Sequence, residues 1–97
     1  FKLYAKAFRN NEYCFISNEY ENSKPNHWVI NLMLKDKYVK YQQSLLRHMH
    51  NNKLLLRELW KPQHLANYLK KYPKSDMSNT VKIWKKTISL PSCYYMK

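Results

Sequence analysis

The chain has 97 residues, of which 44% are hydrophobic and 25% are charged, and its formal net charge is +12 at pH 7. These values describe a globular chain of at most one domain, and they exclude a disordered polymer or an array of several domains. Its apolar runs are far shorter than the roughly 20 residues of a membrane-spanning helix, so we expect no membrane segment.

The first third of the chain predicts a helix followed by two strands. An apolar face at i, i+3 and i+4 spacing, typical of the end of an amphipathic helix, is formed by Leu3, Tyr4, Ala7 and Phe8. Residues 12–17 form a short β-rich run, and residues 18–26 form a polar loop. Residues 27–34 predict the clearest strand. Because both of its alternating faces are largely apolar, we place it in the centre of a sheet.

A longer helix is predicted over residues 37–50, with Asp36 as its N-terminal cap. Asn51 and Asn52 end this helix at a position where glycine usually takes the left-handed turn. Its buried stripe is predicted to comprise Tyr38, Tyr41, Leu45, Leu46 and Met49.

The last part of the chain predicts a strand, a loop, a helix and a strand. Residues 54–60 form a second core strand, and residues 61–76 form a loop with one helical turn near residues 64–69. Ser78 begins a helix, and residues 88–91 close with a short strand. The buried side of this helix is predicted to carry Val81, Trp84 and Ile88. This order of elements predicts one α+β domain over residues 1–97, with a small, mainly antiparallel sheet covered by helices.

The positive charge has two interpretations. A strongly basic chain can bind nucleic acid, and a free-standing basic nucleic-acid-binding module is our alternative function. However, the only arginines are Arg9, Arg47 and Arg57, whereas base and phosphate readers favour arginine. Lysine, asparagine and tyrosine are abundant together, which indicates a compositional bias of the source genome. We therefore expect solvated lysines and no nucleic-acid partner.

Cysteine usage and the start of the chain bear on its origin. Cys14 and Cys93 are isolated thiols without metal-ligand spacing, which favours reduced cysteines in a cytoplasmic protein. No signal peptide is visible. The chain begins at Phe1 and contains no glycine, and both features favour a segment of a longer protein.

One group of residues could bind a ligand, although no complete enzyme motif is visible. Arg57 is predicted to leave a strand at its end, and Trp60 and His64 follow on the next turn. Arginine suits a phosphate or carboxylate, tryptophan stacks on flat rings, and histidine exchanges protons near neutral pH. The alternative is that Trp60 is core, Arg57 pairs with a surface acid and His64 is exposed. Spacing alone favours this alternative.

Three segments carry a family resemblance: "KPNHWVIN", "HNNKLLLRELWKPQHLANYLKKYPKSDMSN" and "ISLPSC". Together they resemble the C-terminal segment of the pyridoxal-phosphate-dependent nucleotide-sugar aminotransferases of the DegT/StrS type, in the branch that serves nonulosonic or legionaminic-type sugars. The chain departs from this pattern at Asn52, Glu58 and Tyr72, where the family has glycine, proline and cysteine. The matching residues are Asn26, Trp28, Asn31, Arg57, Trp60, His64, Tyr68, Pro73, Asp76, Ser78, Asn79, Leu90, Pro91 and Ser92.

The resemblance implies that residues 1–97 are the small C-terminal domain of a fold-type-I aminotransferase. In such enzymes the cofactor-binding lysine and the main phosphate contacts lie in a large N-terminal domain, so this chain alone is expected to be inactive and to bind no pyridoxal phosphate. The whole enzyme would be a cytoplasmic homodimer that aminates a keto-sugar nucleotide. In it, Arg57, Trp60 and His64 are predicted to face the nucleotide-sugar substrate. No metal site is expected.

Overall fold

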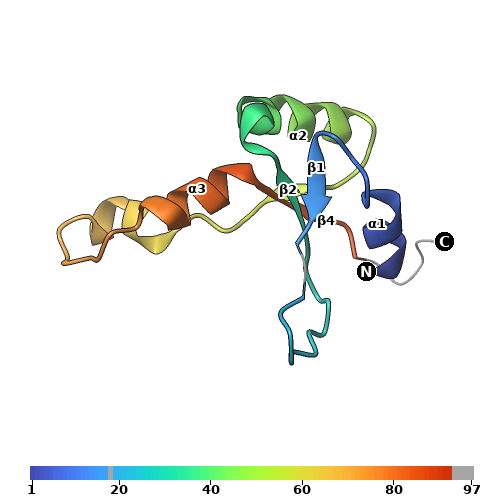
Figure 1. The fold of residues 1–97 in the computed structure, drawn as a ribbon. Helices are drawn as coiled ribbons and strands as arrows, with labels where there is room; N and C mark the ends of the chain where they lie inside the picture. Colours follow the sequence, from blue (N-terminus) through green and yellow to red (C-terminus); the bar gives the residue numbers. More distant parts are fainter. Residues whose placement is uncertain (18, 93–97) are drawn as a thin grey trace.

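The computed structural model describes residues 1–17 and 19–92 and has an α+β fold (Figure 1). Four strands form one sheet in the order β1-β2-β4-β3, and every neighbouring pair in it is antiparallel. The predicted fold class is therefore confirmed. In chain order the elements are α1 (Lys2–Ala7), β1 (Cys14–Ile16), β2 (Ile30–Leu34), the 3-10 helix η1 (Asp36–Tyr41), α2 (Gln42–Asn51), β3 (Arg57–Glu58), the 3-10 turns η2 (Gln63–Leu65) and η3 (Asn67–Leu69), α3 (Ser78–Lys86) and β4 (Thr87–Leu90).

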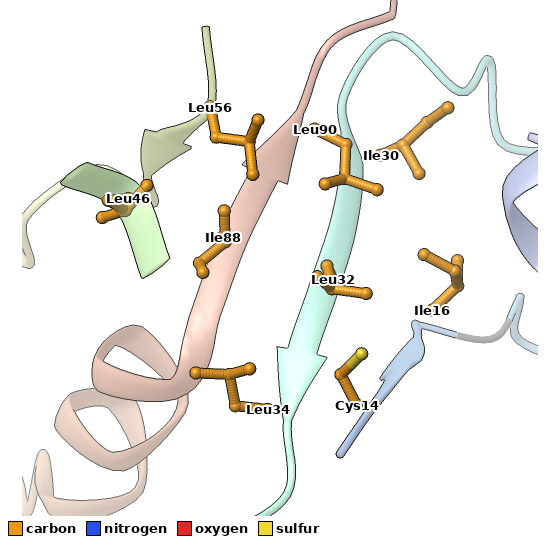
Figure 2. Packing of buried hydrophobic residues seen from close by; sticks show 9 residues of the cluster. All are labelled: Cys14, Ile16, Ile30, Leu32, Leu34, Leu46, Leu56, Ile88 and Leu90. Carbon is orange, nitrogen blue, oxygen red and sulfur yellow. The ribbon is translucent and has the colours of Figure 1, made fainter. Parts of the chain in front are cut away.

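The hydrophobic core lies on one face of this sheet (Figure 2). Alternate residues of a strand point to the same face, so the i, i+2 pattern of β1, β2 and β4 collects their apolar side chains there. Ile88 in β4 is completely buried. The buried cluster comprises Cys14, Ile16, Ile30, Leu32, Leu34, Leu46, Leu56, Ile88 and Leu90.

The predicted central strand is confirmed, but it starts later than expected and buries only one face. Strand β2 pairs with β1 on one side and with β4 on the other. Its ladder begins at Ile30, and Trp28 and Val29 are exposed ahead of it. On the opposite face Asn31 and Met33 are half-buried. The polar residue Asn31 therefore indicates which face of β2 is less buried better than the overall hydrophobicity of the strand does.

Helices α1 and α2 pack against the core through spaced apolar residues. Tyr4 and Phe8 of the α1 region contact the cluster, whereas Leu3 points outward and is exposed. The hydroxyl of Tyr4 donates a hydrogen bond to the carbonyl of Pro91 at 2.9 Å, which ties α1 to the end of β4. On α2, the predicted Leu45, Leu46 and Met49 also pack on the cluster.

The N-terminal part of the predicted long helix differs from expectation. Residues 36–41 form the 3-10 helix η1 instead of the first turns of α2, and Tyr41 at its end is 51% exposed. Asp36 does not cap α2; its carboxylate accepts a hydrogen bond from the Lys86 ammonium at 3.2 Å. Gln42 is buried in place of Tyr41, and its amide donates to the carbonyl of Thr87 at 2.9 Å.

Helix α2 ends at Asn51 and Asn52 as predicted, but the turn after it and the next strand differ from expectation. Helix α2 includes Asn51, and Asn52 follows it with a negative φ. The left-handed residue is Lys53, with φ 61°. The predicted second core strand shortens to the edge strand β3 at residues 57–58, while Leu54 and Leu55 ahead of it are exposed. A run of apolar residues thus contributes one buried side chain, Leu56.

Residues 59–86, which we call the arm, extend away from the sheet (Figure 1). The arm contains η2, η3 and α3, which were predicted as a loop with a helical turn and a helix that starts at Ser78. None of its residues is fully buried. The radius of gyration is 15.0 Å, larger than the roughly 12.5 Å of a compact domain of this length. The arm accounts for this extension.

Cys14 is a free, buried thiol. Burial raises the pKa of this thiol, and the nearby Lys35 ammonium lowers it by less. The protonated thiol is the unreactive form, so Cys14 serves as a core residue. Cys93 lies outside the described residues. None of the helices in the described part of the chain is long and apolar enough to cross a membrane.

Candidate functional site

A row of polar side chains crosses the sheet on the face opposite the core. Asn31 of β2 stands opposite Ser89 of β4, and Ser89 in turn stands opposite Arg57 of β3. The Ser89 hydroxyl donates a weak hydrogen bond to Asn31 Oδ1 at 3.4 Å. Because directly opposite residues of an antiparallel pair share a face, the register alone brings these three side chains together.

This row forms the floor of an open cleft of about 570 Å³. The cleft contains both apolar and polar side chains; it is larger than the pocket beside the loop at residues 19–27, which is about 260 Å³, and smaller than the hollow between α1 and β1, which is about 730 Å³. Its lining comes from three separate stretches of the chain: Trp28, Val29, Asn31, Leu55, Arg57, Glu58, Leu59, Trp60, Ser89, Leu90, Pro91 and Ser92.

Two tryptophans stand at the cleft with most of their surface free. Trp28 is 68% exposed and Trp60 is 78% exposed, and their ring centroids lie 6.2 Å apart at an interplanar angle of 58°. The backbone of Trp28 is fixed on both sides, since its N–H donates to Asn26 Oδ1 at 3.1 Å and its carbonyl accepts from the Ser92 hydroxyl at 2.8 Å. A fixed backbone with an exposed ring suits stacking on a flat ligand.

Arg57 supplies the positive charge of the cleft. Within the described residues it makes no ion pair and no hydrogen bond, although Glu58 follows it directly. Alternation along the strand sends Glu58 to the other face, where its carboxylate accepts a hydrogen bond from the amide of Gln43 on α2. The guanidinium of Arg57 is therefore left available for an external anion.

The structure brings together two of the three predicted site residues. Arg57 and Trp60 both line the cleft, whereas His64 on η2 is not among its lining residues. His64 is half-buried, and its Nδ1 is buried with no hydrogen-bond partner among residues 1–17 and 19–92. The alternative suggested by spacing fails in each part, since Trp60 is not core, Arg57 is not paired and His64 is not exposed.

The cleft can bind a ligand but offers little catalytic chemistry of its own. The ionisable residues that line it are Arg57 and Glu58, but the Glu58 carboxylate points to the other face of the sheet, where it accepts a hydrogen bond from Gln43 of α2. General acid–base catalysis needs a side chain within hydrogen-bond reach of the reacting proton, and the Glu58 carboxylate is already held by Gln43 away from the cleft. In the part of the chain that the structure describes, no group of three or more histidine, cysteine, aspartate or glutamate side chains could hold a metal ion.

Fold and cleft thus define a small α+β domain that presents a cation and two aromatic rings to a ligand. The sequence comparison gives the particular family: over residues 1–97 the chain matches the DegT/DnrJ/EryC1/StrS aminotransferase family, and it belongs to that family. Members of this family are aminotransferases, generally of sugars, and they generally depend on pyridoxal phosphate. No curated protein and no solved structure matches the chain.

The residues that line this cleft do not fit the main binding site of pyridoxal phosphate. Covalent attachment of the cofactor requires a lysine, and the described residues that line the cleft include none. A phosphate group would find one cation there, Arg57, and no glycine-rich loop exists in the chain. The cleft of this chain therefore lacks the groups that hold pyridoxal phosphate.

Further residues of the family pattern line the cleft, although spacing along the sequence does not predict them as site residues. Trp28, Asn31 and Ser92 belong to the matching motif pieces, and each of them lines the cleft with Arg57 and Trp60. The missing information was the strand order, since β4 lies between β2 and β3 although it comes last in the chain. If the sequence had indicated that residues 88–92 lie between the other two motif pieces in the sheet, all three pieces would have been predicted at one place.

Proposed function

We propose that this chain is the small C-terminal domain of a nucleotide-sugar aminotransferase, in the branch that serves nonulosonic or legionaminic-type sugars. In the complete enzyme a large domain supplies the pyridoxal phosphate and its lysine, and amino-group transfer to a keto-sugar nucleotide takes place between the two domains. The protein acts as a cytoplasmic homodimer. The present chain contributes one wall of the substrate site and is inactive alone.

One observation carries the proposal: motif pieces from three distant stretches of the chain line a single cleft. Trp28 with Asn31, Arg57 with Trp60, and Pro91 with Ser92 come from stretches up to 64 residues apart, yet all line the same cleft. Although Asn26, His64, Tyr68, Pro73, Asp76, Ser78 and Asn79 lie outside this lining, the other seven of the fourteen matching residues belong to it. Their convergence supports a shared role in binding.

The chemistry of the wall suits a nucleotide-sugar. The guanidinium of Arg57 can form paired hydrogen bonds with a phosphate oxygen pair, and an exposed tryptophan ring can stack on a nucleobase or on the apolar face of a sugar. Asn31 and Ser89 supply amide and hydroxyl groups for sugar hydroxyls. His64 lies on η2, the turn that follows the cleft in the chain, and its role as a substrate-facing residue stays a prediction.

Replacement of Arg57 tests the proposal in the enzyme that contains this domain. Arg57→Ala removes a charge-assisted contact with the substrate, so we expect kcat/KM for the keto-sugar nucleotide to fall about tenfold or more. The KM for the amino donor should stay unchanged, since that substrate lacks the nucleotide. Steady-state kinetics with each substrate varied in turn provides the measurement.

Arg47→Ala is the matched control, because Arg47 is an exposed arginine on α2 that does not line the cleft. This variant should keep wild-type kinetics. If Arg57→Ala also keeps wild-type kcat/KM, the substrate wall must lie elsewhere and the proposal fails.

A further inference from the structure

The positive charge of the chain is concentrated on the arm. Residues 59–86 contain seven lysines and a single acid, Asp76, which gives a net charge of +6, half of the +12 of the whole chain. Residues 1–30 contain four basic and three acidic residues, a net charge of +1. A uniform genome bias toward lysine does not explain this asymmetry, because it would enrich both segments without removing acids from one.

Most of the positive charge of the arm is exposed and is not neutralised by neighbouring acids. Lys86 pairs with Asp36 at 3.2 Å. The carboxylate of Asp76 accepts hydrogen bonds from the backbone N–H and the hydroxyl of Ser78, each at 3.0 Å. Six other lysines are exposed and have no acidic partner within the described residues: Lys61, Lys70, Lys71, Lys74, Lys82 and Lys85.

Exposed aromatic rings lie among these lysines. Tyr68 is 75% exposed and Tyr72 is 56% exposed, both on the turns that precede α3. The Lys71 ammonium lies 5.4 Å from the centre of the Tyr72 ring. A ring next to a cation offers a stacking face and a phosphate contact within one short stretch, which is the arrangement that binds single-stranded nucleic acids without sequence preference.

We propose that the arm binds single-stranded nucleic acid through its lysines and tyrosines. The scarcity of arginine argues against base-specific reading, but backbone binding needs only point charges, which lysine supplies. An anionic membrane is a poorer match, because on α3 Val81 and Trp84 are half-buried and the exposed Ile83 stands between the exposed Lys82 and Lys85, which leaves no broad apolar face to insert. This binding is independent of the substrate cleft and of the proposed aminotransferase role.

Fluorescence anisotropy with the full 97-residue chain and a labelled 20-nucleotide oligo(U) tests the proposal. We expect binding at 50 mM NaCl that weakens steeply with salt, because each phosphate contact releases counterions. The triple variant Lys70→Gln, Lys71→Gln and Lys74→Gln should weaken binding about tenfold or more and flatten the salt dependence. Tyr72→Leu should weaken binding about fivefold at every salt concentration, since it removes stacking and no charge.

The matched control removes the same charge elsewhere, with Lys2→Gln, Lys6→Gln and Lys24→Gln, all of them exposed outside the arm. It should change the affinity less than threefold. Equal losses in the two triple variants would show diffuse attraction by net charge and would overturn the proposal. No binding of oligo(U) at 50 mM NaCl would also overturn it, as would binding only to phosphatidylserine vesicles.

Discussion

At the scale of single residues, the pair Arg57 and Glu58 shows how strand geometry separates opposite charges. The two are adjacent in sequence, yet one side chain lines the cleft free of partners and the other reaches Gln43 on α2. In a helix the directions of two successive side chains differ by less than they do in a strand, which directs them to opposite faces. The positive charge of the cleft therefore depends on β3 keeping its register with β4.

Asp76 gives a residue-scale prediction on pH. Its backbone hydrogen bond from the Ser78 N–H, followed by that from the Ser78 hydroxyl, lowers the pKa of the Asp76 carboxyl below its ordinary value. The folded chain thus binds this proton more weakly than the unfolded chain does. The resulting stabilisation is complete above the ordinary carboxyl pKa and disappears as the pH falls through the lowered value.

We expect Ser78→Ala to raise the pKa of Asp76 only partway toward its ordinary value, because the backbone N–H donor remains. NMR titration of the side-chain carboxyl carbon measures this shift. Ser75→Ala is a suitable control, since the Ser75 hydroxyl donates to Met77 Sδ and not to Asp76. An Asp76 that titrates at its ordinary pKa in the unsubstituted chain would contradict the prediction.

At the scale of elements, two adjacent glutamines on α2 have different roles. Gln42 is buried, and its amide donates to the carbonyls of Thr87 at 2.9 Å and Trp84 at 3.4 Å, which joins α2 to the start of β4. Gln43 is exposed. Gln42→Ala leaves a buried carbonyl without this donor, so we expect a loss of about 1–3 kcal/mol in the free energy of unfolding.

Gln43→Ala removes the same number of atoms from the same helix, and it should cost only a few tenths of a kcal/mol, as exposed substitutions do. Urea unfolding followed by circular dichroism compares the two variants at equal temperature and pH. A similar midpoint for both would show that the Gln42 bridge adds nothing to stability.

The sequence predicted the type and order of the elements well, because it reports periodicity directly. The helix at residues 2–7, the central strand and the helix starting at Ser78 follow from apolar spacing within each segment. Errors occurred where tertiary contacts decide. Asp36 faces Lys86, fifty residues away, instead of capping a helix, and the sequence near Asp36 carries no sign of that partner.

The candidate site was predictable only where its residues lie close together in the sequence. Arg57 and Trp60 lie close in sequence and reach the same cleft, so local reasoning sufficed for them. Trp28 and Ser92 join them only through the strand order β1-β2-β4-β3, in which the last strand is inserted between earlier ones. Local patterns do not contain this order, so the cleft as a whole required the three-dimensional arrangement.

At the scale of the whole molecule, the chain divides into a sheet with a core and an arm without one. Among residues 1–17 and 19–92, nine buried apolar residues form the cluster on the sheet, and of these Leu46 and Leu56 come from outside β1, β2 and β4. The arm is joined to the rest of the described chain by polar contacts, such as the Lys86 ammonium on the Asp36 carboxylate at 3.2 Å and the Gln42 amide that donates to the carbonyl of Trp84 at 3.4 Å. Burial of apolar surface is the main stabilising term, so the two parts should differ in local stability.

Native-state hydrogen exchange should reveal this difference. The amides of β2 and β4 can exchange only when the core opens, so we expect their opening free energy to approach that of global unfolding. The amide of Val81, which donates to the carbonyl of Met77 at 3.0 Å in the first turn of α3, should exchange through a local opening of much lower free energy. NMR-detected exchange in the presence of low urea concentrations separates the two classes, since only global opening depends strongly on urea. If Val81 and Leu32 showed the same opening free energy and the same urea dependence, sheet and arm would unfold as one cooperative unit.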